Sequence, residues 1–349
     1  MKAIVYEKYG PPEVLRLAEV EKPSPVGEQV LVRVRAVSVN APDWRLMSAD
    51  PFFARVSSGV FRPKRPTLGS DIAGTVEATG EQVEHLHVGD DVFGDLSGFG
   101  FGGFAEYVCV TEKALVRKPA AISFEVAAAS PMAGLTALQG LRDHGGLRPG
   151  QQVLIAGASG GVGTFAVQIA KLLGAEVTAL CSASKIDLAR SLGADHVIDY
   201  TKDDFAKGGV RYDLILAVNG YRSIWDYRHA LAPRGRYLMA GGEWPQIRQA
   251  MLWGPLVSLF GRKKLGNYMV KATQDDLAYL GELLSAGKLK PVIDRSFPLR
   301  ALPDAIRYVE RGHARGKVII SVDSPRVLAH ENQLEGVRVA SAQPVGATG

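Results

Sequence analysis

Gly157, Gly160 and Gly163 stand three residues apart in a stretch whose spacing suits the binding of a phosphate group. An apolar run at 153–156 precedes them and an amphipathic pattern at 162–173 follows them, which predicts a strand, a glycine turn and a helix. In such a unit the first glycine permits a tight turn. The second lets backbone N–H groups approach a pyrophosphate at the helix N-terminus, and the third lets the helix pack on the strand. The pattern therefore predicts a dinucleotide site, and a plain glycine-rich turn is the alternative.

The residues at the end of the next predicted strand indicate which dinucleotide is bound. A site for NAD usually ends this strand, about twenty residues past the glycines, with an acid that bonds the ribose 2′-hydroxyl. No Asp or Glu stands at 177–186, which contains Ser182, Ser184 and Lys185 instead. Hydroxyl and ammonium groups suit a 2′-phosphate, so the sequence predicts NADPH as the cofactor. The alternative is that Lys185 is only a solvated residue in the first turn of the next helix.

The composition indicates a globular protein of more than one domain. The chain has 349 residues, too many for one small core, of which 46% are hydrophobic and 22% charged. The net charge of +5 is spread along the chain without a basic block interleaved with aromatic residues, so we predict no nucleic-acid partner. The cysteines are Cys109 and Cys181, which argues against a disulfide framework and favours a reducing compartment, the cytoplasm.

No segment predicts stable insertion into a membrane. The N-terminus lacks the charged region and long apolar run of a signal peptide. The most apolar late stretch, 250–260, is too short to span a bilayer and contains Gly254 and Pro255. We expect this stretch to be buried or to cover a pocket, with peripheral contact to a membrane as the alternative.

The hydrophobic patterning divides the chain into parts. Residues 1–120 are β-rich, with short strands between glycine-rich turns, and 45–66 have no period and predict a long surface loop. Residues 121–288 alternate strands with helices, which predicts an α/β fold with a doubly wound parallel sheet of the Rossmann type. Residues 289–325 turn β-like again, and 326–349 predict a loosely ordered tail.

The periodicity also locates individual elements in the later parts. Helices are predicted at 125–142, 162–173, 184–192, near residue 203, at 223–231 and at 302–310. Strands are predicted at 153–156, 177–180, 196–198, 214–218, 236–240, 291–297 and 317–322.

Several phrases of the sequence together resemble the medium-chain dehydrogenase/reductase superfamily, in its zinc-independent quinone oxidoreductase (zeta-crystallin-like) branch. They run in the family's order and cover the chain to about residue 322. The resemblance implies a GroES-like β-barrel catalytic domain, completed by the C-terminal segment, into which the Rossmann domain is inserted, with the active site in the cleft between them. The phrases are Ser38-Val-Asn-Ala-Pro-Asp43, Leu68-Gly-Ser-Asp-Ile-Ala-Gly74, Val88-Gly-Asp-Asp-Val-Phe-Gly94, Gly103-Phe-Ala-Glu-Tyr107, Ala133-Gly-Leu-Thr-Ala137, Gly157-Ala-Ser-Gly-Gly-Val-Gly163, Leu192-Gly-Ala-Asp195 and His313-Ala-Arg-Gly-Lys317.

The resemblance also indicates the chemistry, because zinc ligands of related enzymes are missing here. Zinc-dependent relatives have a Cys ligand near Asn40 and a His in the segment that reads Gly69-Ser-Asp71 in this chain, and neither ligand type is present. Without the Lewis acidity of zinc, simple alcohol oxidation is disfavoured. We therefore expect NADPH-dependent hydride transfer to a quinone or an α,β-unsaturated carbonyl, whose oxygen accepts hydrogen bonds as it becomes an enolate.

Three residues are candidates for contact with the reacting groups. Asn40 carries an amide that both donates and accepts, and in similar proteins the Asn of this motif lies beside the nicotinamide. The alternative is an Asn that caps a turn before Pro42. Asp43 is a candidate catalytic residue for which N-capping is the favoured alternative. The resemblance places Thr136 near the carboxamide or phosphates, and its alternative is a threonine in a helix core.

The resemblance implies a larger set of residues around NADPH. A Ser, a Lys and a later Tyr surround the 2′-phosphate in similar proteins, and the matching positions are Ser182, Lys185 and Tyr200. Asn219 and Gly241 follow predicted strands at the sheet edge where ligands bind. The predicted cofactor-binding residues are Thr136, Ser159, Gly160, Gly161, Val162, Ser182, Lys185, Tyr200, Asn219, Gly241 and Lys317.

Two other classes of function share features with this sequence. Short-chain dehydrogenases share the glycine spacing but need a Tyr four residues before a Lys, and no lysine of this chain has one. A non-catalytic or weakly catalytic NADPH-binding protein, crystallin-like or membrane-associated, remains as the alternative function. Because relatives are commonly homodimers, the resemblance also predicts a homodimer.

Overall fold

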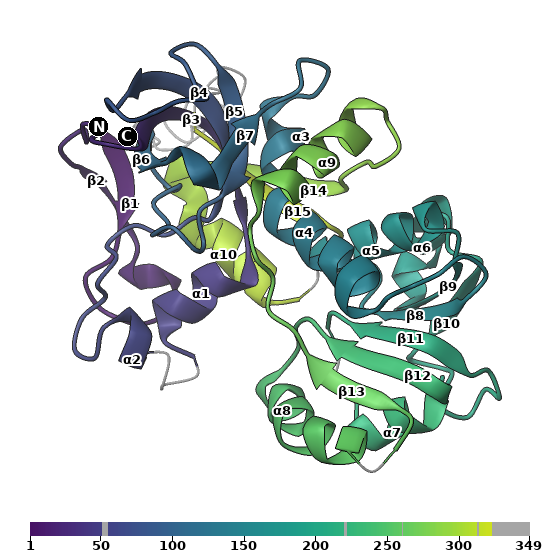
Figure 1. Cartoon of the computed structure of the whole chain (residues 1–349). Coiled ribbons are helices and arrows are strands. Elements are labelled where there is room, and N and C mark those ends of the chain that lie inside the picture. The colour runs from purple at the N-terminus through teal and green to yellow at the C-terminus, as the bar shows by residue number, and fades with distance from the viewer. Residues whose placement is uncertain (51–54, 220–221, 260, 313, 323–349) are drawn as a thin grey trace, which may run out of the picture.

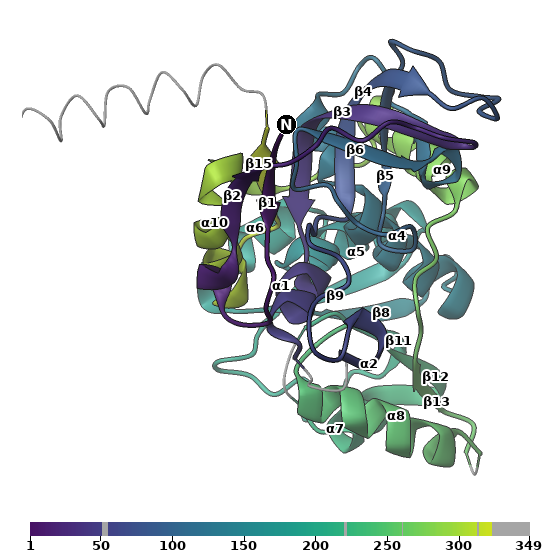
Figure 2. The same ribbon diagram turned by 90° about the vertical axis from the view of Figure 1, so that its left-hand side faces the viewer.

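The chain folds around two sheets, which lie in two parts of the molecule (Figure 1). The computed structural model describes residues 1–50, 55–219, 222–259, 261–312 and 314–322. Figure 2 shows the β-rich part above and the part that alternates strands with helices below. The predicted C-terminal tail lies outside the described residues.

The first sheet combines strands from both ends of the chain. Its order is β14-β15-β3-β4-β5-β7, with β6 also paired to β3, and a separate antiparallel pair joins β1 to β2. β14 and β15 are parallel, whereas the other neighbours are antiparallel. The strands are β1 (Lys2–Val5), β2 (Arg16–Glu19), β3 (Gln29–Val39), β4 (Asp71–Thr79), β5 (Asp91–Asp95), β6 (Tyr107–Thr111), β7 (Leu115–Arg117), β14 (Ile293–Pro298) and β15 (Lys317–Ser321).

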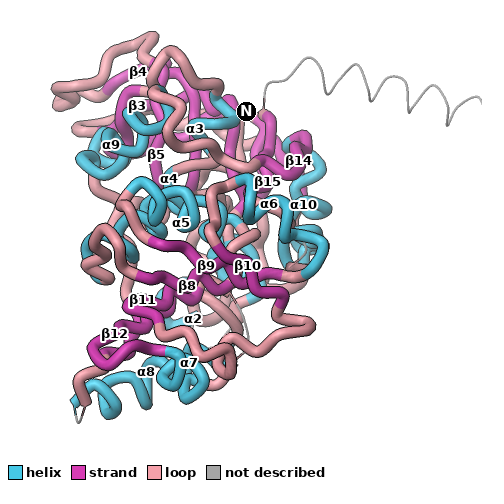
Figure 3. The backbone as a smooth tube through the Cα atoms, turned by 90° about the vertical axis from the view of Figure 1, so that its right-hand side faces the viewer, coloured by secondary structure: helices cyan, strands magenta, loops and turns pink. Residues whose placement is uncertain are grey.

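The second sheet has six strands, all parallel, in the order β10-β9-β8-β11-β12-β13 (Figure 3). The chain order reverses between β8 and β11, and the crevice at such a switch point is where doubly wound sheets bind ligands. The strands are β8 (Gln152–Ala156), β9 (Glu176–Cys181), β10 (His196–Asp199), β11 (Tyr212–Ala217), β12 (Leu231–Met239) and β13 (Lys264–Asn267).

Alternate residues of the second sheet belong to two different cores. Val153 and Ile155 of β8 pack in the same core as Phe165 of the following helix, whereas Leu154 packs with Tyr227 from the other side. Both faces of a parallel sheet are therefore covered by helices, as crossover connections require. The helices are α4 (Pro131–Gln139), α5 (Gly161–Leu172), α6 (Ile186–Ser191), α7 (Ile224–Ala230), α8 (Trp244–Leu259) and α9 (Gln274–Ser285).

The strands predicted in the later parts are present, with ends that differ by a few residues, and the helix predicted at 302–310 is α10 (Leu302–Glu310). The predicted surface loop at 45–66 is wrong over its first residues, because α1 (Ala41–Ser48) continues into it and a short α2 (Arg55–Ser58) follows. Asp43 in the first turn of α1 accepts a hydrogen bond, through Oδ2, from the backbone amide nitrogen of Asn40 at 2.7 Å. This local bond starts a helix that hydrophobic periodicity alone did not reveal.

The helix predicted at 125–142 is divided into α3 (Phe124–Ala128), α4 and a π-helical turn (Gly140–His144). Pro131 begins α4 and has no N–H to continue the preceding helix, which explains the break. The short helix predicted near residue 203 is wrong, since the backbone there forms turns. In addition, α8, β13 and α9 were not predicted.

Over residues 250–259 the predicted apolar stretch is buried only in part, because Ala250 is 1% exposed whereas Leu252 is 65% and Leu259 74% exposed on α8. α3, which follows the division predicted at residue 120, packs on β3 and β4 of the first sheet. Over the residues that the structure describes, no helix combines the length and the apolar character needed to cross a bilayer.

Candidate active site

The glycine turn lies between β8 and α5, and its geometry fits a bound phosphate. Gly157 has φ +84°, a conformation that side chains rarely adopt, and a Cβ on Gly163 would lie 2.1 Å from the Gly157 oxygen. A Cβ on Gly160, by contrast, would lie 3.6 Å from the nearest heavy atom. Gly160 is also the N-cap of α5 and, being a glycine, has no side chain that could cap the helix. The space beside the Gly160 α-carbon therefore leaves room for an anion near the N-terminus of α5, where helices bind anions.

The other predicted ligand positions of this sheet gather around the same turn. Asn219 follows β11, and its amide nitrogen donates to the Ala156 oxygen at 3.4 Å. Gly241 follows β12, where a Cβ would lie 2.7 Å from the Val218 oxygen. The structure thus brings Gly157, Asn219 and Gly241 together at the carboxyl ends of neighbouring strands.

The three residues predicted around a 2′-phosphate lie at the ends of β9 and β10. The Tyr200 amide nitrogen donates to the Cys181 oxygen at 3.1 Å, which brings Tyr200 beside Ser182. Lys185 ends the short turn that begins after Ser182, and its Nζ donates to the Ala314 oxygen at 3.4 Å. The three predicted side chains therefore share one edge of the sheet with the segment that precedes β15.

The charged residues around Lys185 include Arg315 and Asp294, and Asp199 lies on the neighbouring strand β10. Burial lowers the pKa of Lys185, and the positive charge of Arg315 lowers it further. Two cations near one another are typical of an anion site. An acid is also present, because Asp199 at the end of β10 accepts from the Thr201 amide nitrogen at 3.1 Å and from its hydroxyl at 2.7 Å. This carboxylate was missed because it comes from the third strand of the sheet rather than the second.

A second group of polar side chains is buried in the first part of the molecule, around Asn40. The Asn40 amide nitrogen, Nδ2, donates to Asp71 Oδ2 at 2.9 Å and to Ser70 Oγ at 3.2 Å. Asn40 Oδ1 accepts from Lys317 Nζ at 2.5 Å. Ser38 Oγ donates to the same Asp71 oxygen at 3.1 Å. We call Ser38, Asn40, Ser70, Asp71 and Lys317 the Asn40 cluster.

Asp71 links this cluster to the second part of the molecule. Its Oδ1 accepts from the Met132 amide nitrogen in the first turn of α4 at 3.0 Å, where a helix dipole favours negative charge. Its Oδ2 lies 3.6 Å from Lys317 Nζ. Burial raises the pKa of Asp71 and lowers that of Lys317, and each charge opposes the shift of the other. This carboxylate was not predicted as a functional group, because position 71 stood out in the sequence only as part of a missing zinc site.

The candidate catalytic residues are all buried and already hydrogen-bonded. Both Nδ2 protons of Asn40 have acceptors within the cluster, so its amide is held rather than free. Asp43 accepts from the backbone amide nitrogens of Asn40 and Gly69, so its role at the start of α1 is structural, but Asn40 is the N-cap residue and Asp43 lies at the third helical position. Thr136 donates its hydroxyl proton to the Met132 oxygen at 2.6 Å. The lone pairs of the Thr136 hydroxyl oxygen can still accept a hydrogen bond.

The interface between the two parts passes through two further contacts. Arg45 of α1 donates to the Gly242 oxygen, just after Gly241, at 2.6 Å. The Gly316 amide nitrogen donates to the Ser159 oxygen of the glycine turn at 3.1 Å. The two parts of the molecule therefore meet where the Asn40 cluster approaches the glycine turn, and we call this region, next to the switch point of the second sheet, the crevice.

Asp95 at the end of β5 makes the stability of the fold depend on pH. Its Oδ2 is buried without a hydrogen-bond partner among the described residues, and burial together with the negative charge of Asp71 raises its pKa from 3.8 to about 6. Folded Asp95 keeps its proton to about pH 6, whereas unfolded Asp95 loses it near pH 4. Unfolding therefore releases a proton between these values, and stability falls as the pH rises through them.

We expect Asp95→Asn to remove this fall, which is on the order of 1–3 kcal/mol of unfolding free energy. Urea unfolding of both proteins at several pH values from 4 to 8 measures it. The control is Asp91→Asn on the same strand, whose side chain is 41% exposed. Parallel curves for wild type and Asp95→Asn would show that Asp95 does not bind the proton.

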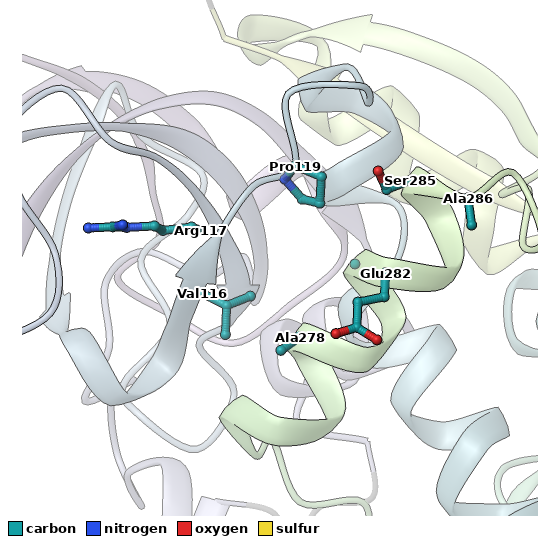
Figure 4. Close-up of a pocket in the computed structure, with 8 residues that line it drawn as sticks. Val116, Arg117, Pro119, Ala278, Glu282, Ser285 and Ala286 are labelled. Carbon is teal, nitrogen blue, oxygen red and sulfur yellow. The ribbon is translucent and has the colours of Figure 1, made fainter.

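Among the described residues, no group of His, Cys, Asp and Glu side chains could hold a metal ion. A cavity of about 550 Å³ opens elsewhere, between β7 and α9, with Arg117 and Glu282 in its wall (Figure 4). None of the residues that line it was predicted as part of the site. The crevice between the glycine turn and the Asn40 cluster is therefore the candidate active site.

Comparison with known proteins agrees with this architecture. Residues 27–120 match the alcohol dehydrogenase GroES-like domain, and residues 192–320 match the zinc-binding dehydrogenase family. Quinone-oxidoreductase QR1, chloroplastic, of Triphysaria versicolor is 36% identical over 92% of this chain and 98% of its own length. NADPH-dependent alkenal/one oxidoreductase, chloroplastic, of Arabidopsis thaliana is 33% identical over 92% of this chain and 79% of its own length. The crystal structure of Escherichia coli quinone oxidoreductase complexed with NADPH superposes with a TM-score of 0.79 at 26% identity, covering 92% of this chain and 100% of that one.

The chain therefore belongs to the medium-chain dehydrogenase/reductase superfamily. Within it, the chain is a member of the zinc-independent quinone oxidoreductase branch and is an oxidoreductase. The predicted fold class is confirmed, with a parallel Rossmann-type sheet inserted into a GroES-like domain. The alternative of a non-catalytic binding protein is disfavoured, because the names of these relatives describe oxidoreductases.

Proposed function

We propose that this protein is an NADPH-dependent, zinc-independent reductase of quinones or α,β-unsaturated carbonyls. One observation carries the proposal: the glycine turn at the N-terminus of α5 and the buried Asn40 cluster are joined through Gly316 and Lys317. Relatives named for quinones and for alkenals and alkenones support both acceptor classes. We keep the predicted division into a catalytic domain, a Rossmann domain and a C-terminal segment. We place the first boundary at the end of α3 instead of residue 120, because α3 packs on the first sheet.

The residues around the turn suit the parts of NADPH. We assign the backbone of Ser159, Gly160, Gly161 and Val162 to the pyrophosphate, because these residues form the open turn and the first N–H groups of α5. Asn219 and Gly241 would flank the dinucleotide at the ends of β11 and β12. These positions agree with the crevice at a topological switch point.

At the adenosine end, we assign Ser182, Lys185 and Tyr200 to the 2′-phosphate. Their shared position after β9 and β10 and the second cation at Arg315 support this assignment. At the nicotinamide end, the acceptor side of the Thr136 hydroxyl suits a carboxamide N–H.

The protein's own part in the reaction is to position two molecules and to supply hydrogen bonds. When bound, NADPH would supply the hydride, and the acceptor oxygen would gain negative charge that hydrogen-bond donors stabilise. Asn40 is held by Asp71, Ser70 and Lys317, so it can bond an acceptor only if one of these contacts is exchanged. We therefore assign Asn40 to shaping and polarising the acceptor side of the crevice.

The test is an assay of NADPH oxidation at 340 nm with a panel of quinones and enones. We expect turnover with at least one acceptor class, no benzyl alcohol oxidation with NADP⁺, and the same rate after dialysis against a chelator. Activity lost on chelation and restored by Zn²⁺ would refute the zinc-independent assignment. Tight NADPH binding without turnover on the whole panel would favour the binding protein instead.

We also propose that the protein is a homodimer. Large apolar side chains of α8 face solvent, and β13 ends the six-stranded sheet with one edge unpaired among the described residues. An apolar face beside a free strand edge suits a second copy of the chain. Sedimentation equilibrium should give twice the chain mass of 37.4 kDa, and a single-chain mass would refute the dimer.

A cytoplasmic location also remains a proposal. Both cysteines are free, which agrees with a reducing compartment. Relatives of similar length are named as chloroplastic proteins, so fractionation of the source cells is the deciding measurement.

A further inference from the structure

Lys317 is attached by its backbone to the glycine turn. It follows Gly316, whose amide nitrogen donates to the Ser159 oxygen at 3.1 Å, and Gly316 forms a parallel bridge with Gly160. Lys317 then begins β15, and its own amide nitrogen donates to the Val292 oxygen at 2.7 Å. The backbone on both sides of this lysine is therefore fixed.

The side chain of Lys317 runs from that turn to the Asn40 cluster. Its Cδ would lie 3.2 Å from a Cβ placed on Gly161, so it passes directly beside the start of α5. Its Nζ ends 2.5 Å from Asn40 Oδ1 and 3.6 Å from Asp71 Oδ2. Only 3% of the side chain is exposed. One residue thus touches both the predicted phosphate-binding turn and the predicted acceptor side.

These contacts leave the Asn40 amide one orientation. Nδ2 faces the Asp71 carboxylate and Oδ1 faces the Lys317 ammonium. A flipped amide would place its oxygen against a carboxylate and its N–H groups against an ammonium, and both pairs repel. The charge and length of Lys317 therefore set the orientation of Asn40.

We propose that Lys317 is a positioning residue, which ties the glycine turn to Asn40 and so holds the dinucleotide and the acceptor in register for hydride transfer. The proposal rests on the proposed function and adds to the predicted cofactor-binding role of Lys317 a contact between its amine and Asn40. A displacement of about 1 Å between reacting groups is enough to lower a rate on the order of 100-fold. Loss of Lys317 should therefore act on kcat more than on NADPH affinity.

The main experiment compares Lys317→Met with wild type. We expect kcat with 1,4-benzoquinone to fall about 100-fold, while the Kd for NADPH, measured by quenching of protein fluorescence without acceptor, changes less than 3-fold. Lys317→Arg should recover part of kcat because it restores a cation. An unchanged kcat, or a loss confined to the Kd for NADPH, would overturn the proposal. A wild type that neither binds NADPH nor reduces any acceptor would instead refute the proposed function.

A matched control and a second variant exclude a merely structural effect. Lys118 is also a buried lysine, with a side chain 5% exposed, 3.6 Å from Asp91 and bonded to the Pro119 and Ile122 oxygens. It lies outside the crevice, so Lys118→Met should leave kcat unchanged.

Removal of Lys317 alone leaves Asp71 buried without its cation, which can destabilise the fold. The double variant Asp71→Asn with Lys317→Met removes both charges. Asp71→Asn is measured alone as well. If both residues act through Asn40, the fold-loss of kcat in the double variant should equal the larger of the losses in Asp71→Asn and Lys317→Met, and should not equal the product of those two losses. A double variant with wild-type kcat would overturn the proposal.

Discussion

Gly160→Ala should fold normally and bind NADPH about 100-fold more weakly than wild type. The added methyl would lie 3.6 Å from the nearest heavy atom, and Gly160 has φ −85°, which alanine readily adopts. Alanine is a poor N-cap but restricts the unfolded chain, so the net change in stability should stay within about 1 kcal/mol. The methyl would occupy the space in which we place the pyrophosphate. Displacing it weakens charge-assisted hydrogen bonds worth about 1.5–3 kcal/mol each.

The measurements are the Kd for NADPH by fluorescence titration and the midpoint of thermal unfolding. Gly208→Ala is the matched control, because its Cβ would lie 3.8 Å from the nearest heavy atom in the same part of the molecule, outside the crevice. We expect this control to bind NADPH like wild type. Normal binding by Gly160→Ala would mean that no pyrophosphate lies on this turn.

The glycine turn could be predicted because everything that defines it is local. The strand, the turn and the helix occupy residues 152–172 without a break, and their signals are hydrophobic period and glycine spacing. Five of the six parallel strands could be predicted for the same reason, since each contains a short apolar run, whereas β13 (Lys264–Asn267) contains a single large apolar residue and was not predicted. Most were located within a few residues of their positions in the structure.

The Asn40 cluster could not be predicted in this way, because its members come from distant segments. Lys317 bonds a residue 277 positions earlier, and Met132 donates to a carboxylate 61 positions earlier. No spacing rule relates such residues, so Asn40 was predicted as an amide beside the nicotinamide, without its buried partners. The signal that was available is Asp71 in the second quoted motif and Lys317 in the last, two opposite charges that a buried site would have to pair.

α8 was missed for a different physical reason. Apolar residues occupy adjacent positions 251, 252 and 253, so they fall on different sides of a helix instead of forming one stripe. Such a run reads as buried, yet Leu252 is 65% and Trp253 47% exposed. A run of apolar residues indicates that their side chains are excluded from water. It does not distinguish burial in the core of one chain from burial under a second chain.

Lys185→Glu should reverse the cofactor preference. We expect the KM for NADPH to rise about 100-fold and the KM for NADH to stay within about 3-fold of its wild-type value. The phosphate on the 2′-oxygen is the difference between the two dinucleotides, so only NADPH meets the new carboxylate. Loss of a charge-assisted bond of about 1.5–3 kcal/mol together with new repulsion accounts for the size of the effect. Arg315 remains in place and limits the loss, because its positive charge already acts on position 185.

The comparison of NADPH with NADH distinguishes this effect from a general change of net charge. Lys207→Glu is the matched control, with the same change of charge on a side chain 86% exposed in the same part of the molecule. We expect both cofactors to keep their wild-type KM in that variant. If Lys185→Glu instead raises both values equally, the 2′-phosphate does not bind there. The Asp199 carboxylate would then be the group to test as a partner for the ribose 2′-hydroxyl of NADH, because its Oδ2 has no hydrogen-bond partner among the described residues.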